Sequence, residues 1–368
     1  MTSVTFDTNA TENPKIRVAV VYGGRSSEHS ISCISAGAVM AHLDRERYEV
    51  VPVGITESGV WTVGEDDPEK LRAHGDQLPS VQLRDELALS LNPNREGEIT
   101  NVSAGRTHAI VDVVFPVLHG PYGEDGTIQG LFELAGVNYV GPGVLSSSAG
   151  MDKEYTKKLA AAEGLPITPE KVLRADESLS ALDREHLGLP VFVKPARGGS
   201  SIGITKVTDA ADLDDAIATA RRFDDKVIVE AMVHGAEVEV GVLEYPDGRI
   251  EASLPAQLNG TEDSDEGFYG FEAKYLDDVV TPSIPAEVGE ETIAELQRLA
   301  IKTFHALDCK GLARVDFFVT DEGPVLNEIN TMPGFTPISM YPQMFAASGV
   351  DYETLLDTLI NSALRPRG

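Results

Sequence analysis

Four polar side chains lie in a segment that is otherwise as apolar as a buried β-hairpin. Arg314 and Asp316 precede the turn DEGP, and Glu328 and Asn330 follow it. Side chains two residues apart on a strand point to the same face of a sheet. A turn that contains glycine makes the two strands antiparallel neighbours. The sequence therefore predicts that all four side chains converge on one patch.

This patch has the chemistry of a divalent-metal site. Two carboxylates brought together repel each other, and removing them from water costs free energy unless a cation lies between them. Carboxylate oxygens and an Asn carbonyl suit a hard cation such as Mg²⁺ or Mn²⁺. The alternative is an exposed sheet face with ordinary salt bridges, and the hairpin alone leaves both interpretations open.

A second candidate site is the glycine-rich loop KPARGGSSIG, which begins at Lys194. Its glycines let backbone N–H groups approach an anion, while Ser200 and Ser201 add hydroxyl donors. A flexible hairpin turn suits the same residues equally well. The chain has neither a Walker motif nor G-x-G-x-x-G, so P-loop and Rossmann chemistry are not indicated. Lys153 in MDKEYTKK is a weaker candidate, because lysines on helices are usually solvated.

Composition and charge restrict the class of protein. The chain has 368 residues, of which 42% are hydrophobic and 24% charged, and its formal net charge is −29. These proportions are typical of a globular chain and not of a disordered one. The strong negative charge argues against a nucleic-acid or anionic-membrane partner. Any bound nucleotide must then be held by local cations.

The expected location is the cytoplasm. The polar N-terminus MTSVTFDTNATENPK lacks the apolar core of a signal peptide, and no apolar run approaches the ~20 residues of a membrane span. Cys33 and Cys309 have neither metal-binding nor redox spacing. We therefore expect two packed thiols in a reducing compartment.

Positioning these candidates calls for three domains. Residues 1–145 are predicted to form a parallel α/β domain, because strands alternate with helices. Residues 64–108 within it are polar and weakly periodic, which indicates an excursion with one short helix. Residues 146–240 are expected to form a small α+β domain with the glycine-rich loop. Residues 241–368 complete the chain with a polar loop at 259–280, the hairpin and further helices.

The individual elements follow from apolar periodicity and turn residues. Strands are predicted at 17–22, 48–56, 111–120, 137–141, 226–233 and 236–245, on both sides of the glycine-rich loop, and around 250–258. Helices are predicted at 33–43, 127–134, 151–164, 209–222 and 287–307, and from Asp351 onwards.

Several segments stand together in an order that resembles the D-alanine–D-alanine ligases, members of the ATP-grasp superfamily. The resemblance runs from about Val18 to Leu364. It rests on GGRSSEHSIS, LHGPYGEDGTIQG, MDKEYTKK, VKPARGGSSIG, VEAMVHGAEVEV, FEAKYLDD and ARVDFFVTDEGPVLNEINTMPGFTPISMYP. It implies a three-domain ATP-grasp fold of α/β and α+β parts, with the nucleotide between the central and C-terminal domains. It also implies a homodimer.

The resemblance implies a reaction and a role for each candidate. Such ligases use ATP to convert one D-alanine into an acyl phosphate, which the amine of a second D-alanine attacks. Asp316, Glu328 and Asn330 would hold two Mg²⁺ or Mn²⁺ ions, and Arg314 with the Gly334 N–H would stabilise the oxyanion. The ATP-binding residues would be Lys153, Lys194, Glu230, Met232, Val233, Glu237 and Phe268.

The same resemblance assigns the remaining site residues. Glu28, Ser200 and Tyr275 would be catalytic, with Tyr275 hydrogen-bonded toward the other two as in ligases that accept D-alanine. The substrate-binding residues would be His119, Lys274, Ser339 and Met340. For His119 a satisfied core histidine is an alternative, and Met340 could simply pack in the core.

Two other functions stay open on sequence grounds. One is a different ATP-grasp ligase, which joins D-alanine to D-lactate or D-serine or acts on another carboxylate. The other is a nucleotide-binding protein of the same fold without catalysis. The long polar segment 259–280 is also expected to act as a lid over the nucleotide, because long loops of this kind often cover active sites.

Overall fold

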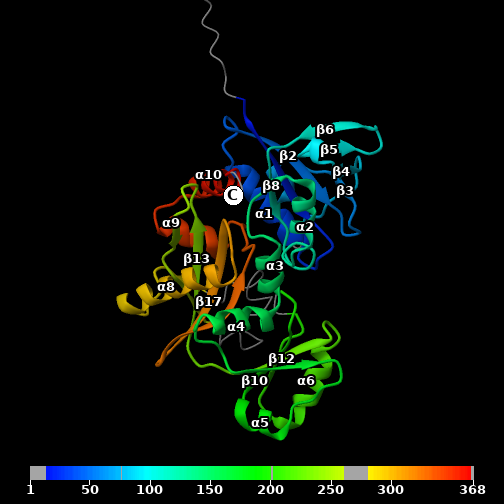
Figure 1. Ribbon diagram of the computed structural model, residues 1–368. Coiled ribbons are helices and arrows are strands. Elements are labelled where there is room, and N and C mark those ends of the chain that lie inside the picture. Colours follow the sequence, from blue (N-terminus) through cyan, green and yellow to red (C-terminus); the bar gives the residue numbers. More distant parts are fainter. Residues whose placement is uncertain (1–13, 76, 200–201, 261–280, 366–368) are drawn as a thin grey trace, which may run out of the picture.

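A computed structural model of the chain describes residues 14–75, 77–199, 202–260 and 281–365. Within these residues the strands form four sheets. Three of them follow one another down Figure 1: the N-terminal sheet at the top, the hairpin-containing sheet in the middle and a green sheet at the bottom. No helix in the described ranges is both long and apolar enough to cross a membrane.

The N-terminal sheet has the strand order β3-β2-β1-β7-β8. Its parallel strands are β1 (Ile16–Gly23), β2 (Tyr48–Ile55), β7 (Val113–Val117) and β8 (Asn138–Tyr139), and β3 (Trp61–Val63) is an antiparallel edge. Helices α1 (His29–His42) and α2 (Thr127–Ala135) connect them. Residues 18–22 of β1 are at most 1% exposed, as expected for a parallel strand covered on both faces. The predicted parallel α/β architecture of this part of the chain is confirmed, and its extent as a domain stays a prediction.

The content predicted for the excursion at residues 64–108, one short helix, was wrong. This segment forms a three-stranded antiparallel sheet of β4 (Leu87–Leu89), β5 (Glu98–Asn101) and β6 (Arg106–Ile110), with 3₁₀ turns η1 (Pro68–Leu71) and η2 (Pro93–Arg95). Leu87 and Ile99 are its buried apolar side chains, while β6 is largely exposed. Strands this short, with so few buried positions, leave no alternating pattern in the sequence.

The helix predicted at 151–164 is in fact divided at Asp152. Helix α3 (Val144–Met151) ends there, and α4 (Lys153–Ala162) begins at the next residue. The Asp152 backbone is extended, and its carboxylate accepts a 3.1 Å hydrogen bond from the Glu154 N–H as an N-cap. The break places Lys153 at the first position of a helix, beside the glycine-rich loop, where its amide donates to the Ala196 carbonyl at 2.9 Å.

The sheet formed by residues 170–231 is the green one at the bottom of Figure 1. It is antiparallel, with the strand order β11-β10-β12-β9. Its strands are β9 (Glu170–Arg174), β10 (Val191–Pro195), β11 (Thr205–Val207) and β12 (Lys226–Ala231). Helices α5 (Ala181–Leu187) and α6 (Leu213–Ala220), with the 3₁₀ turn η3 (Ala210–Asp212), accompany it. Strand β9 and helix α5 were not predicted. Because side chains alternate, Val191 and Val193 enter the core on one face while Phe192 and Lys194 point to the other.

The sheet that contains the hairpin has the order β16-β15-β13-β17-β18, with β14 beside β13. Its strands are β13 (Ala236–Glu244), β14 (Ile250–Ala252), β15 (Ala256–Asn259), β16 (Thr281–Ser283), β17 (Leu312–Thr320) and β18 (Gly323–Asn330). Helix α8 (Glu290–Ala306) covers one face through Leu296, Leu299 and Phe304. The expected lid, 259–280, falls almost entirely outside the described residues.

The end of the chain returns to the N-terminal sheet. Helices α9 (Met340–Ala347) and α10 (Tyr352–Ala363) share a core with α1, β1 and β7, and the red α10 lies beside that sheet in Figure 1. The predicted last helix is confirmed, with Asp351 as its N-cap. Helix α9 was not predicted. The domain boundaries at 145 and 240 stay predictions.

Both cysteines are buried free thiols, as expected. Cys33 belongs to the core of the N-terminal sheet, and Cys309 to the core beneath α8.

Candidate active site

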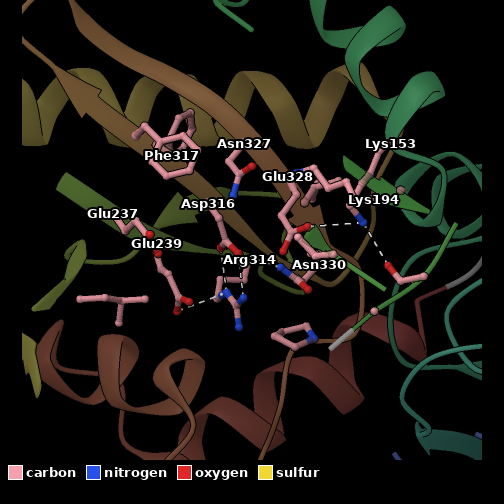
Figure 2. Close-up of a pocket in the computed structure, with 18 of the residues that line it drawn as sticks. Lys153, Lys194, Glu237, Glu239, Arg314, Asp316, Phe317, Asn327, Glu328 and Asn330 are labelled. Carbon is pink, nitrogen blue, oxygen red and sulfur yellow. Dashed lines mark hydrogen bonds and ion pairs between the residues drawn. The ribbon is translucent and has the colours of Figure 1, made fainter. Parts of the chain in front are cut away.

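The four polar side chains of the hairpin do converge. In the antiparallel pairing of β17 with β18, Arg314 lies opposite Asn330 and Asp316 lies opposite Glu328. Figure 2 shows the four side chains grouped on one side of the sheet. The alternating Val315 is completely buried on the other side. The prediction of one common patch is confirmed.

A β-bulge makes this arrangement compatible with a continuous core. The register shifts after Asp316, so that Phe317 pairs with Leu326 and Asn327 is an extra residue on β18. In a regular strand Leu326 and Glu328 would share a face. The extra residue lets Leu326 enter the core while Glu328 faces the polar patch, which is how bulges re-aim side chains near active sites.

Arg314 is held by carboxylates on two strands. Its Nε and Nη2 donate to the two oxygens of Asp316, each at 2.8 Å, and Nε lies 3.2 Å from Glu239 Oε2 on β13. The Asn330 Nδ2 donates to Asp316 Oδ2 at 3.0 Å. The side chains of Arg314 and Asp316 are only 15% and 13% exposed, so the alternative of an ordinary solvated sheet face was wrong.

One cavity of about 270 Å³ collects the predicted site residues that the structure describes. These residues are Glu28, His119, Lys153, Lys194, Glu230, Met232, Val233, Glu237, Arg314, Asp316, Glu328, Asn330, Gly334, Ser339 and Met340. Ser200, Phe268, Lys274 and Tyr275 lie outside the described residues. Strands of two sheets and the loops before α1, after β7 and after β18 therefore meet at one place.

Two lysines bring positive charge to the cavity. Lys153 Nζ lies 3.7 Å from Glu328 Oε2 and donates to the Gly198 carbonyl at 3.0 Å, so it links the hairpin to the glycine-rich loop (Figure 2). Its side chain is 12% exposed, so it is not an ordinary solvated helix lysine. Lys194 is buried and forms an ion pair with Glu230. Burial opposes the charge of Lys194, but the carboxylates of Glu230, Glu328 and Glu170 together outweigh burial and raise its pKa.

Glu230 is enclosed by a second, unpredicted lysine. Lys157 is 1% exposed, and its Nζ donates to Glu230 Oε1 and to Thr168 Oγ1 and lies 3.2 Å from Glu170 Oε2. Burial alone would raise the pKa of Glu230, but Lys157 and Lys194 together lower it to about 2. Glu230 is therefore a fixed carboxylate with a lysine on each oxygen.

The opposite side of the cavity is formed by the loops that precede α1 and follow β7. Glu28 is 6% exposed and His119 5% exposed, and His119 Nε2 lies 3.2 Å from Ser35 Oγ. Burial lowers the pKa of His119 and outweighs the opposite effect of Glu28. Gly120 has φ +74°, and a Cβ at this position would lie 2.6 Å from Glu28 Oε2. Glycine is required there by both the backbone and the carboxylate.

The loop after β18 completes the wall. A Cβ on Gly334 would lie 2.6 Å from Ser339 Oγ, so the glycine permits a close approach of the two segments. The Ser339 hydroxyl accepts a 3.0 Å hydrogen bond from the Thr336 N–H. Met340 begins α9 and lines the cavity, so it does more than pack in a core.

Among the lining or supporting residues missed from the sequence are Glu239, Lys157 and Glu124. Glu239 could have been found, because it lies two residues after Glu237 on an alternating strand and must share its face. Lys157 carried no such signal, since a lysine on a helix gives no indication of burial. Glu124 in the PYGEDG loop lacked any periodic context.

The donor set fits a metal ion only together with phosphate. In the part of the chain that the structure describes, no group of three or more His, Cys, Asp or Glu side chains could hold a metal alone. Asp316 and Glu328 supply two carboxylates, with the Asn330 amide beside them. Mg²⁺ is commonly bound by one or two carboxylates plus substrate phosphates. The two carboxylates of the hairpin match this mode of binding, in which substrate phosphates complete the coordination of the ion.

Comparison with known proteins agrees with the geometry. Residues 17–142 match the family model described as D-ala D-ala ligase N-terminus, and residues 157–361 match D-ala D-ala ligase C-terminus. The chain is 64% identical over 356 residues to the D-alanine--D-alanine ligase of Corynebacterium diphtheriae, covering 97% of each.

Solved structures give the same answer. The D-alanine-D-alanine ligase of Coxiella burnetii superposes with a TM-score of 0.81 at 32% identity, covering 95% of this chain and 94% of that one. The D-alanine--D-alanine ligase of Bacillus anthracis complexed with ATP superposes with a TM-score of 0.71 at 27% identity, covering 95% and 98%. The chain therefore belongs to the D-alanine–D-alanine ligase family and has its ATP-grasp fold.

Proposed function

We propose that the protein uses ATP to join two D-alanine molecules into D-alanyl-D-alanine, a precursor of peptidoglycan. The observation that carries this proposal is the single cavity in which the lysines, the buried acids and the polar hairpin face one another. The Corynebacterium diphtheriae relative, at 64% identity, is named D-alanine--D-alanine ligase. The similar structure from Bacillus anthracis is a complex with ATP. The proposed location is the cytoplasm and the proposed assembly a homodimer.

ATP would lie with its phosphates between the lysines and the hairpin. Lys153 and Lys194 reach into the cavity from α4 and β10, beside Gly198 and Gly199. The adenine and ribose would contact Glu230, Glu237 and the backbone at 232–233, and Phe268 from the segment outside the described residues. The lysines neutralise phosphate charge locally, which an acidic chain with a net charge of −29 requires.

Asp316, Glu328 and Asn330 would hold two divalent cations together with the phosphates. Such cations supply charge neutralisation and orientation of the phosphoryl group. The bonds from Arg314 and Asn330 already fix the Asp316 carboxylate, so its oxygens are placed before any ligand arrives.

The reaction would proceed in two steps. A carboxylate oxygen of the first D-alanine attacks the γ-phosphorus, ADP leaves, and an acyl phosphate forms. The deprotonated amine of the second D-alanine then attacks the carbonyl carbon, and the tetrahedral intermediate expels phosphate and loses the extra amine proton. Arg314 and the Gly334 N–H would stabilise the oxyanion of that intermediate.

The two substrates would occupy opposite walls. Glu28 and His119 would bind the first D-alanine, and Ser339, Met340 and Arg314 would face the second. Lys274 would be a further substrate-binding residue. Glu28, Ser200 and Tyr275 would form the catalytic group that orders the substrates, with Tyr275 as the residue associated with D-alanine as acceptor.

A competition assay tests this function against its alternatives. The protein is incubated with ATP, Mg²⁺ and equal D-alanine and D-lactate near neutral pH, and the products are separated by mass. We expect ADP and D-alanyl-D-alanine as the main products. Mostly D-alanyl-D-lactate would indicate a depsipeptide ligase, and ATP binding without ADP release would indicate a non-catalytic binder. Either result would overturn the proposal.

A further inference from the structure

We propose that Glu124 is a positioning residue that holds the two substrate loops at a fixed separation, so that the second amine meets the acyl phosphate. This inference rests on the proposed function and deepens it. Glu124 Oε2 accepts a 2.7 Å hydrogen bond from the Gly120 N–H, and Oε1 accepts one of 3.3 Å from the Met332 N–H. One carboxyl group thus joins the loop after β7 to the loop after β18.

Each joined loop carries one side of the proposed reaction. Gly120 directly follows His119 and lies against Glu28, on the wall of the first D-alanine. Met332 begins the turn that leads to Gly334 and Ser339, on the wall of the second. These loops are more than 200 residues apart in sequence, and Glu124 connects them directly across the cavity.

A carboxylate suits this position better than any isosteric side chain. The two backbone groups are both donors, and a carboxyl group has an oxygen to place opposite each of them. Glutamine has the same shape but only one acceptor, and its NH₂ group would face a second N–H donor. Glu124→Gln must therefore leave either the Gly120 or the Met332 amide without its partner.

The surroundings of Glu124 disfavour the ionised form of its carboxyl group. The charged groups that act on Glu124 are Glu28 and Arg314, and His119 lines the same cavity from the adjoining loop. Burial and the repulsion from Glu28 raise the pKa of Glu124 to about 8, although the two N–H donors and Arg314 favour ionisation. The carboxyl group is kept in this unfavourable place by the two bonds that it accepts.

Loss of one bond should affect the second step more than the first. Glu124 bonds to the loops after β7 and β18, whereas Lys153 and Lys194, which would hold the ATP phosphates, are on α4 and β10, so the acyl phosphate should still form. The incoming amine depends on the spacing of the two loops, and a displacement of ~1 Å can cost ~100-fold in rate. An acyl phosphate that the second amine does not attack reacts with water and returns D-alanine and phosphate. ATP is then consumed without formation of dipeptide.

The ratio of ADP to dipeptide tests this role. For the wild type we expect one ADP per dipeptide. For Glu124→Gln we expect dipeptide formation to fall by ~10- to 100-fold, a higher KM for D-alanine, unchanged affinity for an ATP analogue, and a ratio clearly above one. Glu133→Gln is the matched control: Glu133 on α2 accepts a 2.7 Å bond from Tyr139 and does not line the cavity. It should behave as wild type.

A second variant keeps the test decisive if Glu124→Gln folds poorly. Glu124→Asp retains two acceptor oxygens but is too short to reach both loops, so it should also uncouple ADP from dipeptide. A ratio of one in the folded variants, with ADP and dipeptide falling together or not at all, would overturn the positioning role. A wild type that makes no dipeptide would instead overturn the proposed function.

Discussion

Replacing Lys157 by Met tests how much the buried ion pairs of Lys157 with Glu230 and Glu170 stabilise the nucleotide side of the cavity. The Lys157 ammonium donates to Glu230 and Thr168 and lies 3.2 Å from Glu170, and its side chain is 1% exposed. Met has a similar length but no charge. The variant would leave two carboxylates on neighbouring strands, Glu170 and Glu230, with Lys194 as the cation that remains in contact with Glu230.

The expected loss is large because the cluster is buried. Removing one partner of a buried ion pair costs about 3–5 kcal/mol, and Lys194 places this case near 3 kcal/mol, or roughly 100-fold in an opening equilibrium. The pKa of Glu230 is lowered from 4.5 to about 2 in the folded protein. Its contribution is therefore fully present above pH 4.5 and is lost as the pH falls toward 2. The difference between wild type and variant should be smaller at pH 4 than at pH 7.

Hydrogen exchange of the β12 amides is the appropriate assay. The single tryptophan, Trp61, lies in the N-terminal sheet, so its fluorescence would not report on this cluster. We expect peptides covering 226–231 to exchange roughly 100-fold faster in Lys157→Met. Lys158→Met is the matched control, because Lys158 is 59% exposed and its buried partner Glu154 keeps ion pairs with Arg174 and Lys226 when Lys158 is removed. Equal exchange in the two variants would refute the reasoning.

Three further outcomes follow from the same geometry. Arg314→Lys should lower kcat about 100-fold, because lysine cannot reproduce the two-oxygen contact with Asp316 and offers one oxyanion donor fewer. Circular dichroism should show an intact fold, and activity within a few-fold of wild type would contradict this role of Arg314. Cys33 and Cys309 should not react with a disulfide reagent in the native protein, because burial raises the pKa of each thiol to about 12. Dipeptide formation should rise from acidic to mildly alkaline pH as the amine of the second D-alanine loses its proton; a flat profile would contradict amine attack.

The sequence was most informative where a local pattern determines geometry. Alternation along β17 and β18 was enough to group Arg314, Asp316, Glu328 and Asn330, because strand periodicity fixes the face of each side chain. It did not reveal the bulge at Asn327, which depends on how Leu326 packs in the core. The family resemblance supplied the rest of the cavity residues, which no short-range pattern connects.

The failures have a physical reason in common. Asp152 ends one helix and begins another because its carboxylate caps α4 and also bonds to Lys226, which is 74 residues away. The strands at 87–110 are held by only a few buried side chains. Lys157 is buried because distant carboxylates compensate it. In each case a tertiary contact overrides the local preference, and that contact is absent from any short window of sequence.

The proposed reaction requires the hairpin carboxylates to hold divalent cations together with the phosphates of ATP. Binding of Mn²⁺ in the presence of a non-hydrolysable ATP analogue, followed by the electron paramagnetic resonance signal of the free ion, measures this directly. We predict two ions per wild-type chain and an affinity at least about tenfold weaker in Asp316→Asn. Asp321→Asn, at the exposed turn of the same hairpin, should bind as wild type. Unchanged Mn²⁺ binding by folded Asp316→Asn would contradict the account.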